Sequence, residues 1–161
     1  MNIDRNKLMH RLSRSRKLAY GIAAVELGLT IVPLLTLTFG MTEYSRMIFT
    51  YNALAKATRD AARHMTSTSV NRRAEAINLA LYGTVAPTVG TTPLLAPDLL
   101  ASNVVICSAG DEAGCPSEPH VVGGIDLVTV RISGYVYRSI ITYVAPATLS
   151  FNQISTTMRS E

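Results

Sequence analysis

The sequence has no tryptophan, and its 161 residues include only two cysteines and three histidines. The histidines, His10, His64 and His120, are far apart, and no close cysteine or histidine accompanies them, so the spacing of a zinc site is missing. The glycine-rich phosphate loop, the paired-histidine helix of zinc proteases and the glycine-flanked serine of hydrolases are also missing. We therefore expect no catalytic residue, metal or cofactor, and predict that the protein is not an enzyme.

Acidic residues are scarce near the N-terminus, and in the rest of the chain they are about as numerous as basic residues. Residues 1–21 contain six lysines and arginines against one aspartate, whereas residues 22–161 contain nine basic and ten acidic residues. The formal net charge of +4 therefore arises from a short basic tail. A nucleic-acid-binding surface places basic residues among aromatic ones on the folded body, so we expect no nucleic-acid partner.

Charge is almost absent from Leu18 to Met41, where Glu26 is the single charged residue and Pro33 the single proline. As a helix, residues 22–41 would span about 30 Å, the thickness of a bilayer's hydrocarbon core. The predicted anchor includes Ile22, Leu29, Pro33, Leu35 and Phe39. Because the basic tail comes before this run, the positive-inside rule places the N-terminus in the cytoplasm and exports the C-terminus.

Glycine and proline are missing between Met41 and Met65, so we expect one helix from Ile22 to Met65, about 65 Å long. Its predicted apolar stripe has helical spacing and comprises Tyr44, Met47, Ile48, Tyr51, Leu54, Ala55, Thr58, Ala61, Ala62 and Met65. Polar residues from Thr66 to Ser69 should end the helix. We accordingly divide the chain into a leader (1–21), a transmembrane and extramembrane helix (22–66) and a small exported domain (67–161).

The exported domain is predicted to be α+β. A short helix is expected from Asn71 to Leu81, closed by Gly83. Runs rich in β-branched residues then predict a few antiparallel strands, at Asn103–Cys107, Ile125–Tyr137 and Leu149–Thr157. Turns are expected at Gly110–Asp111, Gly114–Pro119 and Gly123–Gly124.

The glutamate at position 26 is costly in this setting. A carboxylate inside a membrane-spanning run is penalised by about 3 kcal/mol on the insertion scale and is usually retained for a function. A positive charge at the same depth would offset the penalty, but none lies between Ala19 and Tyr44. Cleavage after Gly21 would create one, the α-amino group of Ile22.

The stretch Gly21-Ile22-Ala23-Ala24-Val25-Glu26 resembles a type IV prepilin cleavage site, with glycine before the cut and glutamate fifth after it. The resemblance extends over residues 21–63 to the TadE-like minor pseudopilins of Tad (Flp-type) pili. It rests on Val25-Glu26, Pro33-Leu34-Leu35, Gly40-Met41-Thr42-Glu43-Tyr44 and Ala57-Thr58-Arg59-Asp60-Ala61-Ala62-Arg63.

The resemblance implies a pilin-like subunit that is processed by a prepilin peptidase in the bacterial inner membrane, with its C-terminal domain in the periplasm. Its implied partners are other pilin or pseudopilin subunits, the inner-membrane assembly platform and the lipid bilayer. Its implied role is assembly of an adhesive pilus used in biofilm formation. Glu26 of one subunit would pair with the Ile22 amine of a neighbour and set the axial register.

Three alternatives remain open at this point. The chain is a secreted domain if a signal peptide is removed before Met41. It is an unprocessed, signal-anchored scaffold or ligand-binding protein of a secretion complex if the leader stays intact. The chain is a pseudopilin of a type II secretion machine in the third alternative, because those proteins carry the same kind of leader. For Pro33 we favour an ordinary membrane-helix proline over a kink used during extraction.

Cys107 and Cys115 bracket a short loop rich in glycine and acidic residues. On the exported side of a membrane, oxidation is expected, so we predict a disulfide between them in preference to two free thiols.

Overall fold

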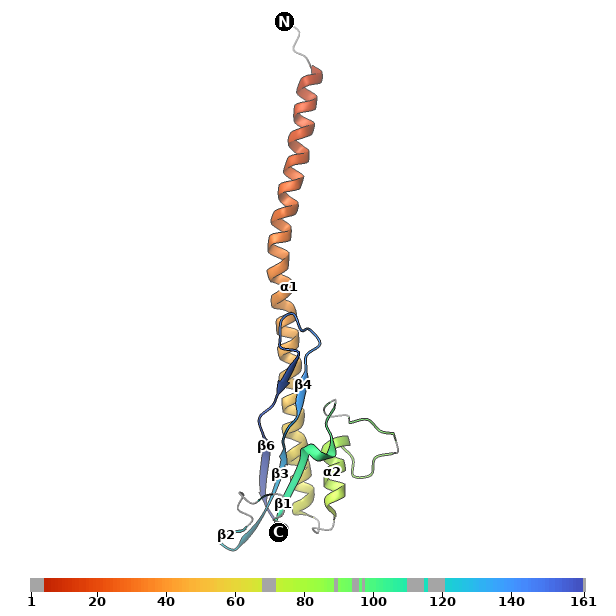
Figure 1. Ribbon diagram of the computed structural model, residues 1–161, viewed down its shortest axis with the longest axis vertical. Coiled ribbons are helices and arrows are strands. Elements are labelled where there is room, and N and C mark those ends of the chain that lie inside the picture. The colour runs from red at the N-terminus through yellow and green to blue at the C-terminus, as the bar shows by residue number, and fades with distance from the viewer. Residues whose placement is uncertain are drawn as a thin grey trace. The chain divides into compact units, whose positions relative to one another are not determined.

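The computed structural model describes residues 5–67, 72–88, 90–93, 96, 98–109, 115 and 121–160, and for residues 5–20 the backbone alone. The chain forms two compact units, Met1–Thr42 and Glu43–Glu161, here called the N-terminal and C-terminal units. Helices and antiparallel strands both occur, which confirms the predicted α+β class (Figure 1).

Helix α1 (Arg5–Thr66) contributes to both units. The predicted start at Ile22 is wrong, because the helix begins at Arg5 and includes most of the basic leader. Residues 5–20 contain no glycine or proline to prevent this. The predicted end is confirmed at Thr66, where the hydroxyls of Thr66 and Ser67 donate to the carbonyl of Arg63 at 2.9 and 3.2 Å.

The C-terminal half of α1 presents a buried face made largely of small residues. Its fully or almost fully buried members recur at three- and four-residue spacing: Leu54, Ala57, Thr58, Ala61, Ala62 and Met65. The predicted apolar stripe is buried only in part, because its members Tyr44, Ile48 and Tyr51 are exposed. Small side chains allow other elements to approach the helix backbone closely, so the covered face follows the alanines and not the largest apolar residues.

The main sheet is antiparallel and centred on β3 (Ile125–Ile132). Strand β1 (Val104–Ser108) pairs along one edge of β3, and β6 (Ile154–Arg159) pairs along the other. The short β2 (Val121–Val122) pairs with the beginning of β3. These strands lie beside the C-terminal half of α1 (Figure 1).

Register determines which face of the sheet meets the helix. Val130 lies between Ile106 on β1 and Thr156 on β6, so these three side chains share a face. On that face the hydroxyls of Thr58 and Thr156 are hydrogen-bonded at 2.9 Å, which fixes α1 against the sheet.

Two predicted strands are interrupted in the structure. The expected strand Ile125–Tyr137 breaks after β3 at Gly134, whose φ of 70° suits glycine, and resumes as β4 (Val136–Arg138). The expected strand Leu149–Thr157 splits into β5 (Thr148–Ser150) and β6. Strands β4 and β5 form a separate two-stranded sheet.

Turn chemistry was predicted well where the structure describes it. Gly123 and Gly124 have φ of 59° and 80°, as a two-residue hairpin between β2 and β3 requires, although β2 itself was not predicted. Helix α2 (Arg73–Tyr82) ends at Gly83, whose N–H donates to the carbonyl of Leu79 at 2.9 Å. A short 3₁₀ turn, η2 (Ala101–Asn103), leads into β1. The turns predicted at Gly110–Asp111 and Gly114–Pro119 lie outside the described residues, apart from Cys115.

Candidate functional site

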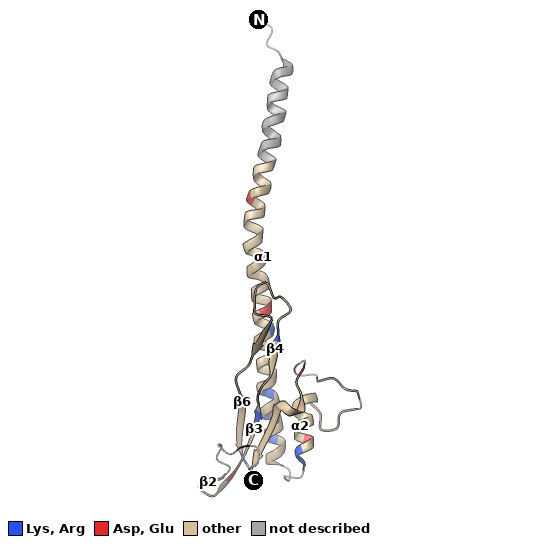
Figure 2. Ribbon diagram, in the orientation of Figure 1, with Lys and Arg blue, Asp and Glu red and all other residues tan. Residues whose placement is uncertain are grey.

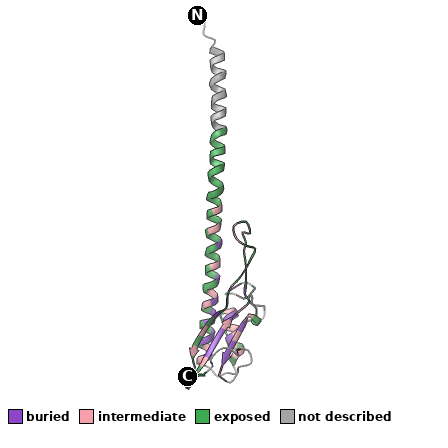
Figure 3. Cartoon of the chain, turned by 60° about the vertical axis from the view of Figure 1, so that its left-hand side comes forward, coloured by how far each residue is buried: buried purple, intermediate pink, exposed green. Residues whose placement is uncertain are grey.

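Residues 21–42 of the N-terminal unit form an apolar helix that the described part of the chain leaves largely uncovered. Residues 21–42 are exposed except for Thr36 and Gly40, which are half-buried (Figure 3). Glu26 is the one charged residue in this stretch, and Figure 2 shows the rest of it without acidic or basic colour. Residues Gly21–Thr66 have a mean hydropathy of 2.0 in their most apolar window, so this one helix is long and apolar enough to cross a membrane.

The polar side chains of this helix satisfy their own hydrogen-bonding groups. Thr30, Thr36, Thr38 and Thr42 each donate a hydroxyl to a carbonyl one turn earlier, at 2.8–3.1 Å. In lipid, such bonds avoid the cost of an unpaired donor. Pro33 lies inside α1 without ending it. The predicted anchor residues Ile22, Leu29, Leu35 and Phe39 are all exposed.

The predicted processing residues Gly21, Ile22 and Glu26 lie within about one and a half turns of this exposed helix. The side chain of Glu26 has no hydrogen-bond or ion-pair partner among the residues whose side chains are described. A Cβ added at Gly21 would meet nothing within 4 Å, so the local structure does not require glycine there.

Glu43, just after the apolar run, is the most enclosed carboxylate among the described residues, with 3% of its surface exposed. Tyr137 of β4 donates its hydroxyl to Glu43 Oε1 at 2.7 Å, and the backbone N–H of Ile140 donates to the same oxygen at 3.3 Å. Arg46, one turn along α1, donates to both carboxylate oxygens at 3.3 Å. These bonds attach the β4–β5 hairpin to α1 inside the C-terminal unit.

These contacts shift the acidity of both partners in opposite directions. The hydrogen bond from Tyr137 lowers the pKa of Glu43 against the opposing effect of burial, and the backbone N–H of Ile140 and the positive charge of Arg46 lower it further. Burial raises the pKa of Tyr137 to about 12, with the bond to Glu43 adding to the effect. At neutral pH the pair is therefore an ionised carboxylate held by a neutral phenol.

A group of aromatic rings also joins α1 to the residues around β4 and β5. The ring of Phe151 lies 5.7–5.9 Å from the rings of Tyr51, Tyr135 and Tyr137. The guanidinium of Arg46 lies 5.7 Å from the centre of the Tyr137 ring, within cation–π range. Glu43, Arg46 and this aromatic group together hold β4 and β5 on the helix.

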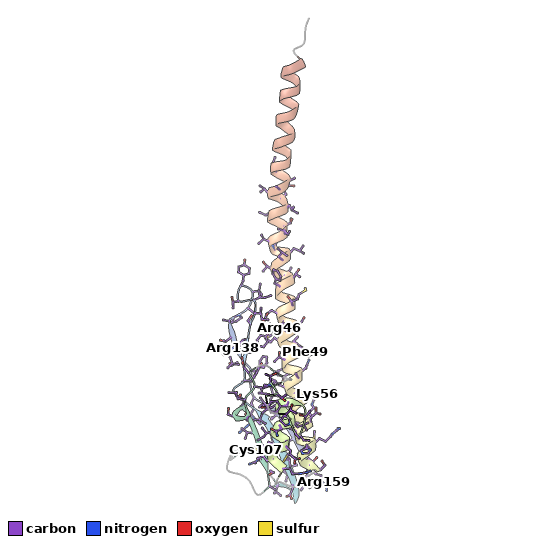
Figure 4. All side chains as sticks on the ribbon, turned by 90° about the vertical axis from the view of Figure 1, so that its right-hand side faces the viewer. Arg46, Phe49, Lys56, Cys107, Arg138 and Arg159 are labelled. Atoms are coloured by element: carbon purple, nitrogen blue, oxygen red, sulfur yellow. A yellow bond between two sulfur atoms is a disulfide. The ribbon has the colours of Figure 1, made fainter. Side chains whose placement is uncertain are left out.

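A cavity of about 200 Å³ opens beside this cluster, lined by Arg46, Thr50, Asp98 and residues 135–138. Both of its arginines are already engaged, Arg46 with Glu43 and Arg138 with Asp98, each at 3.3 Å. Ligand sites usually offer about 300–1,000 Å³ and unpaired polar groups, so this cavity does not favour a ligand-binding function. In Figure 4, Arg46 and Arg138 lie at the same end of the C-terminal unit, and Cys107 and Arg159 lie toward the other.

The structure joins Cys107 and Cys115 in a disulfide, as predicted, with their Cα atoms 6.0 Å apart. Among the described residues no group of three or more histidines, cysteines and acidic residues is placed to hold a metal ion. His64 is instead bonded to Glu75 at 3.2 Å. His10 and His120 lie outside the described side chains.

The fold and the exposed helix together fit a single-pass membrane protein with one N-terminal apolar helix. Residues 21–63 match the family model described as TadE-like protein, which confirms the predicted resemblance. The TadE-like family is one of pilus components and is not known for catalysis. No curated protein and no solved structure matches the chain.

The matched segment has two physically different halves. Residues 21–42 form the exposed apolar helix, whereas residues 43–63 supply the buried Glu43 and the alanine-rich face that packs on the sheet. The sequence motif Ala57–Arg63 is therefore explained within the chain by packing. Its alanines are buried, and Arg59, Asp60 and Arg63 lie on the exposed side.

Proposed function

We propose that this protein is a membrane-anchored minor pilin or pseudopilin that serves in assembly of a Tad (Flp-type) pilus. The observation that carries the proposal is the TadE-like match over residues 21–63, because it covers an exposed apolar helix whose one charge within residues 21–42 is Glu26. The first 21 residues act as a basic cytoplasmic leader. A prepilin peptidase removes it after Gly21, and the C-terminal unit resides on the periplasmic side of the inner membrane.

Glu26 is the register residue in this proposal. In the membrane its carboxylate is costly, and the α-amino group of a neighbouring subunit's Ile22 offsets that cost when helices pack together. The same pairing sets how far one subunit is displaced along the filament axis relative to the next. The apolar residues keep the helix in the lipid bilayer, whereas the one carboxylate weakens its insertion. The helix can therefore be withdrawn from the bilayer into an assembly.

Surface on α1 outside the membrane run supports subunit packing. Tyr44, Ile48 and Phe49 are exposed, with Phe49 at 74%, while the alanines of the same helix at positions 57, 61 and 62 are buried in the core of the C-terminal unit. Large apolar residues left uncovered next to a membrane segment are suited to contact another helix. The helix therefore offers exposed apolar side chains to partner subunits in addition to the buried ones that pack in its own domain.

The first test is the N-terminus of the protein purified from membranes, measured by intact mass. The proposal expects a chain that begins at Ile22. A chain that begins at Met41 would indicate a secreted domain, and an intact Met1 would indicate an unprocessed anchor that scaffolds or binds in a secretion complex. Either result would overturn the proposed processing.

A second test separates storage from assembly. Replacing Glu26→Ala should leave the membrane level of the protein unchanged and reduce the number of pili seen by electron microscopy. Thr30→Ala is the matched control, because Thr30 lies one turn further along the same exposed helix and is uncharged. Normal piliation of the Glu26→Ala strain would contradict the register mechanism.

A further inference from the structure

The loop between β4 and β5, residues 139–147, is apolar and exposed. Its sequence, Ser-Ile-Ile-Thr-Tyr-Val-Ala-Pro-Ala, contains no charged residue. Ile140 is 71% exposed and Tyr143 is 79% exposed, and the loop projects from the body of the C-terminal unit (Figure 3). Large apolar side chains gathered on one exposed loop are characteristic of contact surfaces.

The loop has a defined internal structure. The N–H of Ser139 donates to the carbonyl of Ala147 at 3.0 Å and closes its base. Within it, the N–H groups of Val144 and Ala145 donate to the carbonyl of Ile141 at 3.2 and 3.3 Å. Ordering the loop before contact reduces the entropy that binding must otherwise offset.

Its attachment holds the loop beside the first residue of the C-terminal unit. The backbone N–H of Ile140 donates to the carboxylate of Glu43, and Glu43 comes two residues after Met41, where the apolar run ends. The loop is thus held at the end of the C-terminal unit where the chain leaves the apolar helix. Strand β2 lies toward the opposite end (Figure 1).

We propose that loop 139–147 docks on the bilayer surface, with Ile140 and Tyr143 entering the zone between headgroups and hydrocarbon. This inference rests on the proposed function, since it requires α1 to be a membrane anchor. Tyrosine is enriched at this zone because its ring is apolar and its hydroxyl is hydrated. The anchor also keeps the loop beside the bilayer at a high effective concentration, so a small contact area suffices.

The contact is apolar and not electrostatic. Arg138 immediately precedes the loop, and Arg46 lines the same cavity as Arg138. Arg46 is paired with Glu43, and Arg138 is paired with Asp98. The local charge is therefore balanced, and docking needs no anionic lipid. A second point of attachment restricts tilting of the C-terminal unit while the protein is stored in the membrane, and it is released when the helix is withdrawn.

The absence of tryptophan makes a direct test possible, because a single introduced indole reports its own surroundings. We would reconstitute the full chain into phosphatidylcholine vesicles, with and without bromine on the acyl chains, and compare Tyr143→Trp, Phe39→Trp and Val121→Trp. Bromine quenches an indole only at close range. Phe39 marks the anchor, and Val121 is an exposed residue of β2.

We expect brominated lipid to reduce the emission of Tyr143→Trp and Phe39→Trp and to leave that of Val121→Trp unchanged. Quenching of Phe39→Trp without quenching of Tyr143→Trp would overturn the loop proposal and leave the anchor intact. No quenching of Phe39→Trp would overturn the anchor and with it both proposals. Tyr143→Trp emission that depends on the protein-to-lipid ratio and not on bromine would assign the loop to a second copy of the chain.

A second experiment varies the lipid headgroup and tests whether docking depends on charge. Adding phosphatidylglycerol to the vesicles should leave the quenching of Tyr143→Trp unchanged. Quenching that occurs only with the anionic lipid would overturn the apolar mode of docking.

Discussion

Glu43 is a buried, charged residue whose carboxylate accepts hydrogen bonds from protein groups in place of water. Removing the carboxylate by Glu43→Ala leaves the buried hydroxyl of Tyr137 without its acceptor and Arg46 without its ion pair. We expect the free energy of unfolding to fall by about 3 kcal/mol. The measurement is urea unfolding of the full chain in detergent micelles, followed by circular dichroism. Asp60→Ala is the control, because Asp60 is exposed on the same helix and its loss should cost under about 0.5 kcal/mol.

The same residue makes stability depend on pH. Because the pKa of Glu43 is lower in the folded chain than its ordinary value of 4.5, the unfolded chain takes up the proton more readily. The stabilisation is complete above pH 4.5 and is lost as the pH falls through the folded pKa. Thermal unfolding between pH 7 and pH 3 should therefore show a smaller decline for Glu43→Gln than for the natural chain. An identical decline would show that other carboxylates dominate the acid response.

The pairing of Glu43 with Tyr137 was not predictable from the sequence. The two residues are 94 positions apart, and a glutamate just after a membrane run is ordinarily exposed to water. The sequence motif that contains Glu43 was recognised, but its partner lies in a region where the predicted strand ran through the break at Gly134. By contrast, the disulfide was predictable, because two cysteines allow only one pairing within the chain.

At the scale of the element, α1 shows why small residues matter on the side of a helix that meets a sheet. Ala61 is fully buried in the core of the C-terminal unit, so a larger side chain there would force its neighbours apart. We expect Ala61→Leu to lower the free energy of unfolding by about 1–3 kcal/mol. Lys56→Leu, an exposed position on the same helix, should have little effect on stability. Equal effects from the two substitutions would mean that the alanine face is not tightly packed.

Secondary structure was predicted from periodicity where the pattern is long, and less well where it is short. The helical repeat identified the body of α1 and its end, but not which side the sheet covers, because exposed Tyr44 and Ile48 fit the same apolar period. The strand breaks depend on backbone contacts between distant residues. One of these is the N–H of Phe151 donating to the carbonyl of Tyr135 at 3.1 Å. Such contacts leave no local signal except a glycine.

At the scale of the whole molecule, the disulfide reports which side of the membrane holds the C-terminal unit. Disulfides form outside the cytoplasm, so a periplasmic unit should carry Cys107 and Cys115 oxidised. Treating cells with a polyethylene-glycol maleimide under denaturing conditions should add no mass to the protein, and prior reduction should add two tags. Two tags without reduction would place the unit in the cytoplasm and contradict the predicted orientation.

The pairing of Thr58 with Thr156 has a consequence for the timing of synthesis. The two hydroxyls that fix the helix to its sheet are 98 residues apart. At a synthesis rate of about 5–20 residues per second, the alanine face of α1 waits roughly 5–20 s for its covering strand β6 to be made. During that interval the helix has been completed but its domain has not. The growing chain therefore needs other cover for this face, and the synthesis of β6 decides when the face is closed.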